Sequence, residues 1–213
     1  FSVHRSCERL HTTYLDLVYL HDVEFVKFPD ILEALKELRT LKNKGVIKNF
    51  GISGYPIDFI TWLAEYCSTE ESDIGSLDAV LSYCNLNLQN NKLLNFRERL
   101  LRNAKLKMVC NASILSMSLL RSQETRQFHP CSHELRECAS QAAKYCQEQN
   151  VDLADLATRY AISEWVGKGP VVLGVSSMEE LKLALDNYEI VKSNGNRLSS
   201  KDGQPPGFER QFP

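Results

Sequence analysis

The chain has 213 residues, of which 43% are hydrophobic and 24% are charged, and its formal net charge at pH 7 is −2. These values are typical of a globular protein, and they exclude the strongly basic surface that general nucleic-acid binding requires. Apolar stretches all fall short of the roughly 18 residues that a membrane span needs, so we expect neither a membrane segment nor a signal peptide.

The seven cysteines indicate a reducing compartment. Their number is odd, and none forms a Cys-x-x-Cys pair. Cys84 and Cys110 lie within apolar runs, where reduced cysteine packs as a small hydrophobic side chain. We therefore expect a cytoplasmic protein.

The stretch 15–22, Leu-Asp-Leu-Val-Tyr-Leu-His-Asp, predicts a buried strand. Residues 4–13 before it read as the end of a helix, so we expect the chain to continue a longer parent. Side chains alternate along a strand, which puts Tyr19 and His21 on one face. His21 then lies at the carboxyl end of the strand, where parallel α/β folds have their active sites. A structural histidine with a hydrogen-bond partner is the alternative.

Strand and helix patterns alternate along the rest of the chain. Further strands are predicted at 46–53, 77–84, 106–113 and 171–176, with helices at 29–44, 56–67, 93–103, 133–150, 153–165 and 178–191. This alternation indicates a parallel sheet with helices packed outside it, in an open doubly wound sheet or part of a barrel. Small or polar clusters close four of the strands, at 21–22, 53–54, 111–113 and 174–177. A ring of such ends around one mouth favours part of an eight-stranded barrel, with the site built by several βα loops.

We assign residues 1–193 to this partial barrel. Residues 194–213 are rich in Asn, Ser, Gly and Pro, and they are predicted to be a disordered tail.

Two local motifs have competing interpretations. His129, Cys131, His133 and Cys138 are metal-ligand types, but a structural zinc site usually joins two separated ligand couples, so we predict no metal site. The segment 174–180, Gly-Val-Ser-Ser-Met-Glu-Glu, has the small residues and helix start that suit a phosphate. Its Ser177 and Glu180 equally match a capping box.

Taken together, these stretches resemble the aldo-keto reductase family. The residues that carry the likeness are 14–22, Ala34-Leu-Lys-Glu-Leu, 45–53 (Gly-Val-Ile-Lys-Asn-Phe-Gly-Ile-Ser), 113–120 (Ser-Ile-Leu-Ser-Met-Ser-Leu-Leu) and 173–177 (Leu-Gly-Val-Ser-Ser). They occur in family order over about residues 5–190. The local residue patterns are most similar to the branch of the family that oxidises sugars such as L-galactose or D-arabinose.

The resemblance implies a (β/α)8 TIM-barrel fold of which about the last five βα units are present, in an NAD(P)-dependent oxidoreductase with a small sugar as substrate. The net charge and the short apolar stretches indicate no nucleic-acid or membrane partner. By likeness, His21 is the histidine of the family's catalytic set of Asp, Tyr, Lys and His. Ser53 would contact the nicotinamide amide, and Ser82 would lie beneath the nicotinamide. Ser113 and Leu115 would border the pyrophosphate, and Gly174, Ser176 and Ser177 the adenosine phosphate.

Several positions depart from the family pattern. Gly54 stands where many members have Asn, Ala112 where many have a stacking ring, Ile114 for a common Pro, and Ser118 for a common Gly. The three strands that carry the catalytic Asp, Tyr and Lys have no counterpart. We therefore expect this chain alone to be inactive and its exposed sheet edges to favour aggregation. A catalytically dead remnant that serves as a binding or regulatory module is the alternative; the sequence does not indicate an oligomeric state.

The expected cofactor is NAD, with NADP as the alternative. Family members that prefer NADP usually carry an Arg on the last helix, and the corresponding residue here is Glu180. Its carboxylate would repel a 2′-phosphate and could accept a hydrogen bond from a ribose hydroxyl.

Overall fold

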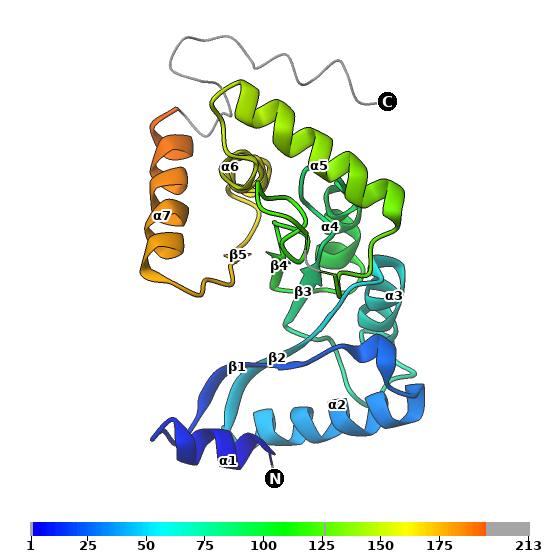
Figure 1. Cartoon of the computed structure of the whole chain (residues 1–213). Coiled ribbons are helices and arrows are strands. Elements are labelled where there is room, and N and C mark those ends of the chain that lie inside the picture. The colour runs from blue at the N-terminus through cyan, green and yellow to red at the C-terminus, as the bar shows by residue number, and fades with distance from the viewer. Residues whose placement is uncertain (1, 126, 195–213) are drawn as a thin grey trace. The chain divides into compact units, whose positions relative to one another are not determined.

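The computed structural model describes residues 2–125 and 127–194, which form two compact units (Figure 1). The first unit contains the chain up to Asn85 and residues 92–111, and the second contains residues 86–91 and those from Ala112 onward. The predicted disordered tail lies, apart from Asn194, outside the described residues.

The elements follow the predicted order closely. In the first unit they are α1 (Ser2–Arg9), β1 (Leu15–Leu20), the 3-10 helix η1 (Val23–Phe25), α2 (Phe28–Asn43), β2 (Ile47–Gly54), α3 (Ile57–Cys67), β3 (Ala79–Tyr83), α4 (Lys92–Arg102) and β4 (Met108–Ala112), whose last residue belongs to the second unit. The second unit has α5 (His133–Glu148), α6 (Leu153–Trp165), β5 (Val171–Val172) and α7 (Met178–Ser193). The alternation of strand and helix, and with it the partial (β/α) barrel, is confirmed.

Helix α2 shows how the sequence encodes these elements. Pro29 lies in its first turn, where the missing N–H of proline costs no helical hydrogen bond. Its buried residues recur at helical spacing: Ile31, Leu35, Leu38 and Leu41. Gly45, two residues beyond the helix, has a φ of +74°, a conformation that glycine adopts without steric cost. The chain therefore turns there into β2.

The strands of the first unit pair in parallel, and the register separates two faces of the sheet. Val18 pairs with Phe50 and Tyr19 with Gly51 across β1 and β2. The Phe50 ring lies beneath the Arg39 guanidinium and the Lys42 ammonium, so its face is the one that α2 covers. Tyr19 lies on the opposite face, as the predicted alternation requires.

That opposite face is curved enough for a side chain of β1 to reach β4. The Tyr19 hydroxyl lies 3.4 Å from the Cys110 sulfur. Between them in the sheet stand two small residues, Gly51 and Ala79, which pair across β2 and β3. A Cβ atom at Gly51 would collide with the Ala79 carbonyl oxygen. A glycine is therefore needed for this close approach of strands.

Burial raises the pKa of Tyr19 far above its usual range, and the hydrogen bond with Cys110 adds to the rise. Burial also raises the pKa of the Cys110 thiol, against a smaller opposing effect of Tyr19. Both groups are therefore neutral at physiological pH.

Two strand predictions were partly wrong. β1 was expected to be buried, but Asp16 is exposed and the other five residues are half-buried, because β1 is the first strand of the sheet order and its recorded pairing is with β2. The last strand was expected over 171–176 but ends at Val172. Leu173 and Val175 are 38% and 45% exposed, so burial does not hold this segment extended as a strand.

Asp78, immediately before β3, connects four segments of the first unit. Its carboxylate accepts hydrogen bonds from Lys107 Nζ at 2.8 Å, Lys42 Nζ at 2.5 Å and the Phe50 N–H at 3.1 Å. Its backbone carbonyl also accepts from the Lys107 and Met108 N–H groups. Burial alone would raise the pKa of Asp78, but these hydrogen bonds outweigh it and lower the pKa.

In the second unit, α5 and α6 share a small core of Ala143, Cys146, Leu153 and Leu156. Side-chain oxygens of Ser132 and Asp152 cap the two helices by accepting from Leu135 N and Ala154 N. Among residues 2–125 and 127–194, no helix has the length and apolar character to cross a membrane.

Candidate functional site

The carboxyl end of β1 presents His21 to solvent. His21 is the first residue beyond the strand, and its side chain is 78% exposed. Its Nδ1 lies 3.0 Å from an Asp22 carboxylate oxygen. Asp22 has a φ of +53°, so the chain turns sharply into η1 directly after the histidine. The imidazole is thus accessible to solvent and has a carboxylate beside it.

Ser53 lies at the carboxyl end of the neighbouring strand β2. Leu20 pairs with Ile52, and this is the last pair between β1 and β2. His21 and Ser53 are the residues that follow this pair along the chain. By alternation from the Tyr19–Gly51 pair, Ser53 lies on the face away from α2. The serine is 3% exposed, and its hydroxyl has no hydrogen-bond partner within the described part of the chain. A buried hydroxyl left in this state has a free energy cost.

The register of β2 and β3 puts Ser82 and Ser53 on opposite faces of the sheet. Ser53 pairs with Leu81, and Ser82 pairs with Gly54. Successive side chains alternate, so Ser82 lies on the opposite face of the sheet from Ser53, and the two serines do not share a face. Ser82 is fully buried and its hydroxyl accepts a hydrogen bond from Asn85 Nδ2 at 3.0 Å. Leu81 is the β3 residue beside Ser53.

Two residues that the sequence analysis did not single out hold the loop after β2. The N–H of Tyr55 donates to Glu24 Oε1 at 2.8 Å, and its carbonyl accepts from Asn85 Nδ2, also at 2.8 Å. Glu24 belongs to η1 after β1, and Asn85 follows β3. The Tyr55 backbone is therefore tied on one side to the segment after His21 and on the other to the segment after β3. No local pattern signals either bond, because each joins positions about 30 residues apart.

In the second unit, Ser113 and Leu115 begin a tight turn after β4. The Ser113 hydroxyl accepts from Met117 N at 3.1 Å, and the Leu115 carbonyl accepts from Leu120 N at 3.1 Å. Ser118, which replaces a common family glycine, has a φ of +69°. That left-handed conformation explains why glycine suits the position, since serine pays a steric penalty there.

Ser176, Ser177 and Glu180 form a compact cap at the start of α7. The Ser177 hydroxyl accepts from Glu180 N at 3.1 Å, and Glu180 Oε2 accepts from Ser176 N at 2.6 Å and from the Ser176 hydroxyl at 2.9 Å. These hydrogen bonds lower the pKa of Glu180, and the bond from the Ser176 N–H has the largest effect. The positive charge of Arg121 lowers it further. The first turn of α7 thus carries an ionised carboxylate. Gly174 is exposed, with open space where a Cβ atom would lie.

His129 has a structural role. Its Nε2 lies 2.9 Å from the Ser116 carbonyl oxygen, and its Nδ1 accepts from Cys131 N at 3.1 Å. Both ring nitrogens therefore fix the loop before α5. Within the described ranges, no group of three or more His, Cys, Asp or Glu side chains is arranged to hold a metal ion.

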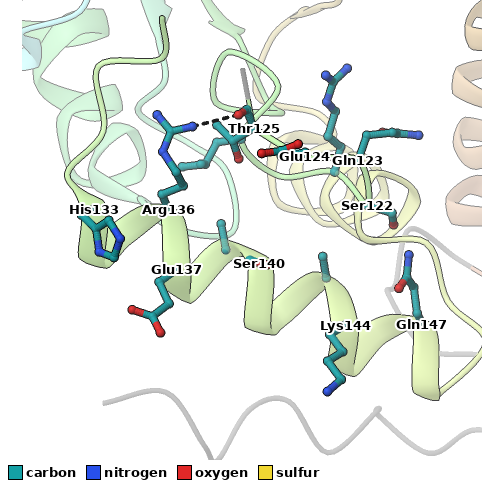
Figure 2. Close-up of a pocket in the computed structure, with 14 residues that line it drawn as sticks. Ser122, Gln123, Glu124, Thr125, His133, Arg136, Glu137, Ser140, Lys144 and Gln147 are labelled. Atoms are coloured by element: carbon teal, nitrogen blue, oxygen red, sulfur yellow. Dashed lines mark hydrogen bonds between the residues drawn. The ribbon is translucent and has the colours of Figure 1, made fainter. Parts of the chain in front are cut away.

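A cavity of about 580 Å³ opens in the second unit between residues 121–125 and α5 (Figure 2). Arg136 crosses it and donates to the Thr125 carbonyl at 2.9 Å. Cationic and acidic side chains both line the cavity: Arg121, Lys144, Glu124 and Glu137. None of the residues predicted from the sequence to form the site is among its lining residues.

Comparisons with known proteins agree with the fold. The model of the aldo/keto reductase family matches residues 1–200. L-galactose dehydrogenase of Arabidopsis thaliana is 30% identical over 182 residues, which are 85% of this chain and 54% of that protein.

Two solved structures share the fold. The holo form of the aldo-keto reductase AKR11C1 from Bacillus halodurans superposes with a TM-score of 0.58 at 21% identity, over 88% of this chain and 60% of that one. The apo form superposes with a TM-score of 0.59 at 20% identity, over 88% and 61%.

The chain belongs to the aldo/keto reductase family. It spans about half the length of the curated relative that it matches.

Proposed function

We propose that this chain carries the cofactor-binding strands and the catalytic histidine of an NAD(P)-dependent sugar dehydrogenase, acting on a pyranose-type sugar of the L-galactose or D-arabinose class. The observation that carries the proposal is the position of His21. It is exposed directly after the carboxyl end of β1, and His21 and Ser53 each follow the last residue pair of the adjacent strands β1 and β2. This is the end of the strands where barrel enzymes build their sites. The likeness to L-galactose dehydrogenase supports the sugar class.

The residues at the carboxyl end of β2 fit a nicotinamide group. Ser53 Oγ is a buried donor and acceptor without a partner in the described residues, and a carboxamide offers the complementary acceptor and donor. Ser53 would hold the nicotinamide, which would supply the hydride acceptor for oxidation of a sugar hydroxyl group. His21 orients the sugar oxygen and assists release of its proton, and Ser53 holds the carboxamide once its hydroxyl turns toward the ligand.

We propose NAD rather than NADP as the cofactor. The ionised Glu180 stands at the start of α7, where a 2′-phosphate of about −1.5 to −2 charge would meet like charge. The complete enzyme is here a protein that joins this chain to the three barrel strands it lacks. Its kcat/KM should be higher with NAD than with NADP. Glu180→Arg should shift the preference toward NADP, because a guanidinium pairs with phosphate. Higher kcat/KM with NADP in the unchanged enzyme would contradict this assignment.

We further propose that the 213-residue chain alone is inactive and that the complete enzyme works in the cytoplasm. Removal of the hydroxyl proton requires a base, and in this family that base is a Tyr with a neighbouring Lys that have no counterpart here. His21 is the one member of the catalytic set that the sequence matches.

A purified chain, assayed with NAD or NADP and either D-arabinose or L-galactose, should give no turnover. A protein that adds the missing strands should be active. Turnover of the chain alone at about 1–10³ s⁻¹ would contradict the inactive-fragment assignment. No turnover and no cofactor binding by the completed protein would support the alternative of a catalytically dead remnant.

A further inference from the structure

Gly54, the last residue of β2, and Glu24 of η1 form a close pair. A Cβ atom at position 54 would lie 2.5 Å from Glu24 Oε2 and 3.3 Å from Glu24 Cδ. Both distances are shorter than a van der Waals contact, so a side chain at position 54 and this conformation of Glu24 exclude each other. Gly54 has an ordinary φ, so steric room for the Glu24 carboxylate is what requires glycine here.

The two oxygens of the Glu24 carboxylate are used differently. Oε1 accepts from the Tyr55 N–H at 2.8 Å, and Oε2 is buried without a hydrogen-bond partner in the described residues. Leaving a carboxylate oxygen in that state is unfavourable, so stability alone does not explain the arrangement. Its geometric effect is to tie the segment two residues beyond Ser53 to the segment three residues beyond His21.

We propose that Glu24 is a positioning residue, which fixes the carboxyl end of β2 relative to that of β1 so that Ser53 meets the nicotinamide, and that Gly54 is required to admit its carboxylate. This inference rests on the function proposed above. Asn85 holds the Tyr55 carbonyl and completes the restraint from the β3 side. Glu24 acts through the Tyr55 backbone and does not itself touch the cofactor.

Position 54 provides a second way to break the same contact. An added Cβ displaces the far end of a flexible glutamate, so Gly54→Ala should release Glu24 from Tyr55 N without forcing the backbone to move. The Cβ would also lie 3.0 Å from Ile60 Cγ2, a contact that a small shift relieves. Gly54→Ala should therefore reproduce the effect of Glu24→Ala, and the double variant should be no worse than either single variant.

The test measures binding of two ligands to the complete enzyme by calorimetry. NADH contains the nicotinamide, and ADP-ribose lacks it. Glu24→Ala and Gly54→Ala should each weaken NADH binding about tenfold, the effect of losing one orienting hydrogen bond, with ADP-ribose affinity unchanged. Glu24→Gln, whose amide oxygen can still accept from Tyr55 N, should restore NADH binding. Glu33→Ala, at an exposed glutamate of α2, is the matched control and should change neither affinity.

Equal weakening of both ligands, no weakening of NADH, or additive losses in the double variant would each overturn the positioning role. If the unchanged enzyme bound neither ligand, the proposed function itself would be wrong and the positioning role would fall with it. Thermal unfolding of the unchanged enzyme, Glu24→Ala, Gly54→Ala and the double variant would then still measure whether positions 24 and 54 are coupled in stability.

Discussion

The amino end of β3 and the carboxyl ends of β1 and β2 hold their buried polar groups in opposite ways. At the amino end, Asp78 is 4% exposed, and each of its carboxylate oxygens has a partner. At the carboxyl ends, the atoms Ser53 Oγ and Glu24 Oε2 are buried, and neither has a hydrogen-bond partner among the described residues. The same sheet thus satisfies one set of groups fully and leaves another unsatisfied.

The difference follows from what unsatisfied groups cost. A buried polar atom without a hydrogen bond destabilises the fold by about 1–3 kcal/mol, so a protein keeps one where something else is gained. In barrel enzymes that gain is made at the carboxyl ends of the strands, where ligands supply the partners, and the amino ends serve stability. Substitutions at the two ends should therefore separate activity from stability.

The largest effect on activity is expected at His21. In the complete enzyme, His21→Ala should lower kcat/KM by about 10²–10⁴, the usual contribution of a group that orients or transfers a proton. The free energy of unfolding should change by less than about 0.5 kcal/mol, because the side chain is largely exposed. Steady-state kinetics and urea unfolding of the same preparation check both values. An unchanged rate would remove His21 from the site.

The largest effect on stability is expected at Asp78. Asp78→Ala leaves Lys42 and Lys107 without their shared partner and the Phe50 N–H without its side-chain acceptor, and it should cost about 3–5 kcal/mol of unfolding free energy. NADH affinity of the folded fraction should stay the same.

The matched control is Asp73→Ala, which removes an exposed ion pair with Lys36 and should cost about 0–1 kcal/mol. An equal loss of unfolding free energy in Asp73→Ala and Asp78→Ala would contradict this prediction. It would show that the burial and the hydrogen bonds of Asp78 add nothing to stability.

The stability due to Asp78 should depend on pH. Its pKa is lower in the folded protein than in the unfolded chain, so its ionised form stabilises the fold above the unfolded pKa of about 3.9. That contribution disappears as the pH falls through the lower folded pKa. The difference in unfolding free energy between the unchanged protein and Asp78→Ala should therefore be constant from pH 5 to 7 and shrink below about pH 4. If this difference in unfolding free energy grew as the pH fell, the pKa of Asp78 would be raised and not lowered by folding.

Local patterns in the sequence were sufficient to predict the order of strands and helices. Gly45 marked the end of α2, and the predicted helix over 153–165 has those same bounds in the structure. The periodicity of apolar residues also separated Tyr19 from Val18 on the two faces of β1. These features depend on neighbours within one or two turns, which a single sequence displays.

Features that depend on distant residues were not predictable. The bonds from Glu24 and Asn85 to Tyr55 join separate strand ends, and neither residue lies in a recognisable motif. The face of Ser82 depends on the register with Gly54, and family likeness alone did not fix it. The roles of His21, Ser53, Ser82, Ser113, Leu115, Gly174, Ser176, Ser177 and Glu180 stay predictions.

Ser53→Ala tests most directly the claim that the carboxyl ends trade stability for ligand binding. Removing an unsatisfied buried hydroxyl should leave the unfolding free energy unchanged or slightly higher, while NADH affinity of the complete enzyme falls about tenfold through loss of one hydrogen bond. Calorimetric titration with NADH and urea unfolding of one preparation give both numbers. Unchanged NADH affinity together with a loss of more than about 1 kcal/mol in stability would contradict the account, because Ser53 would then be an ordinary structural residue.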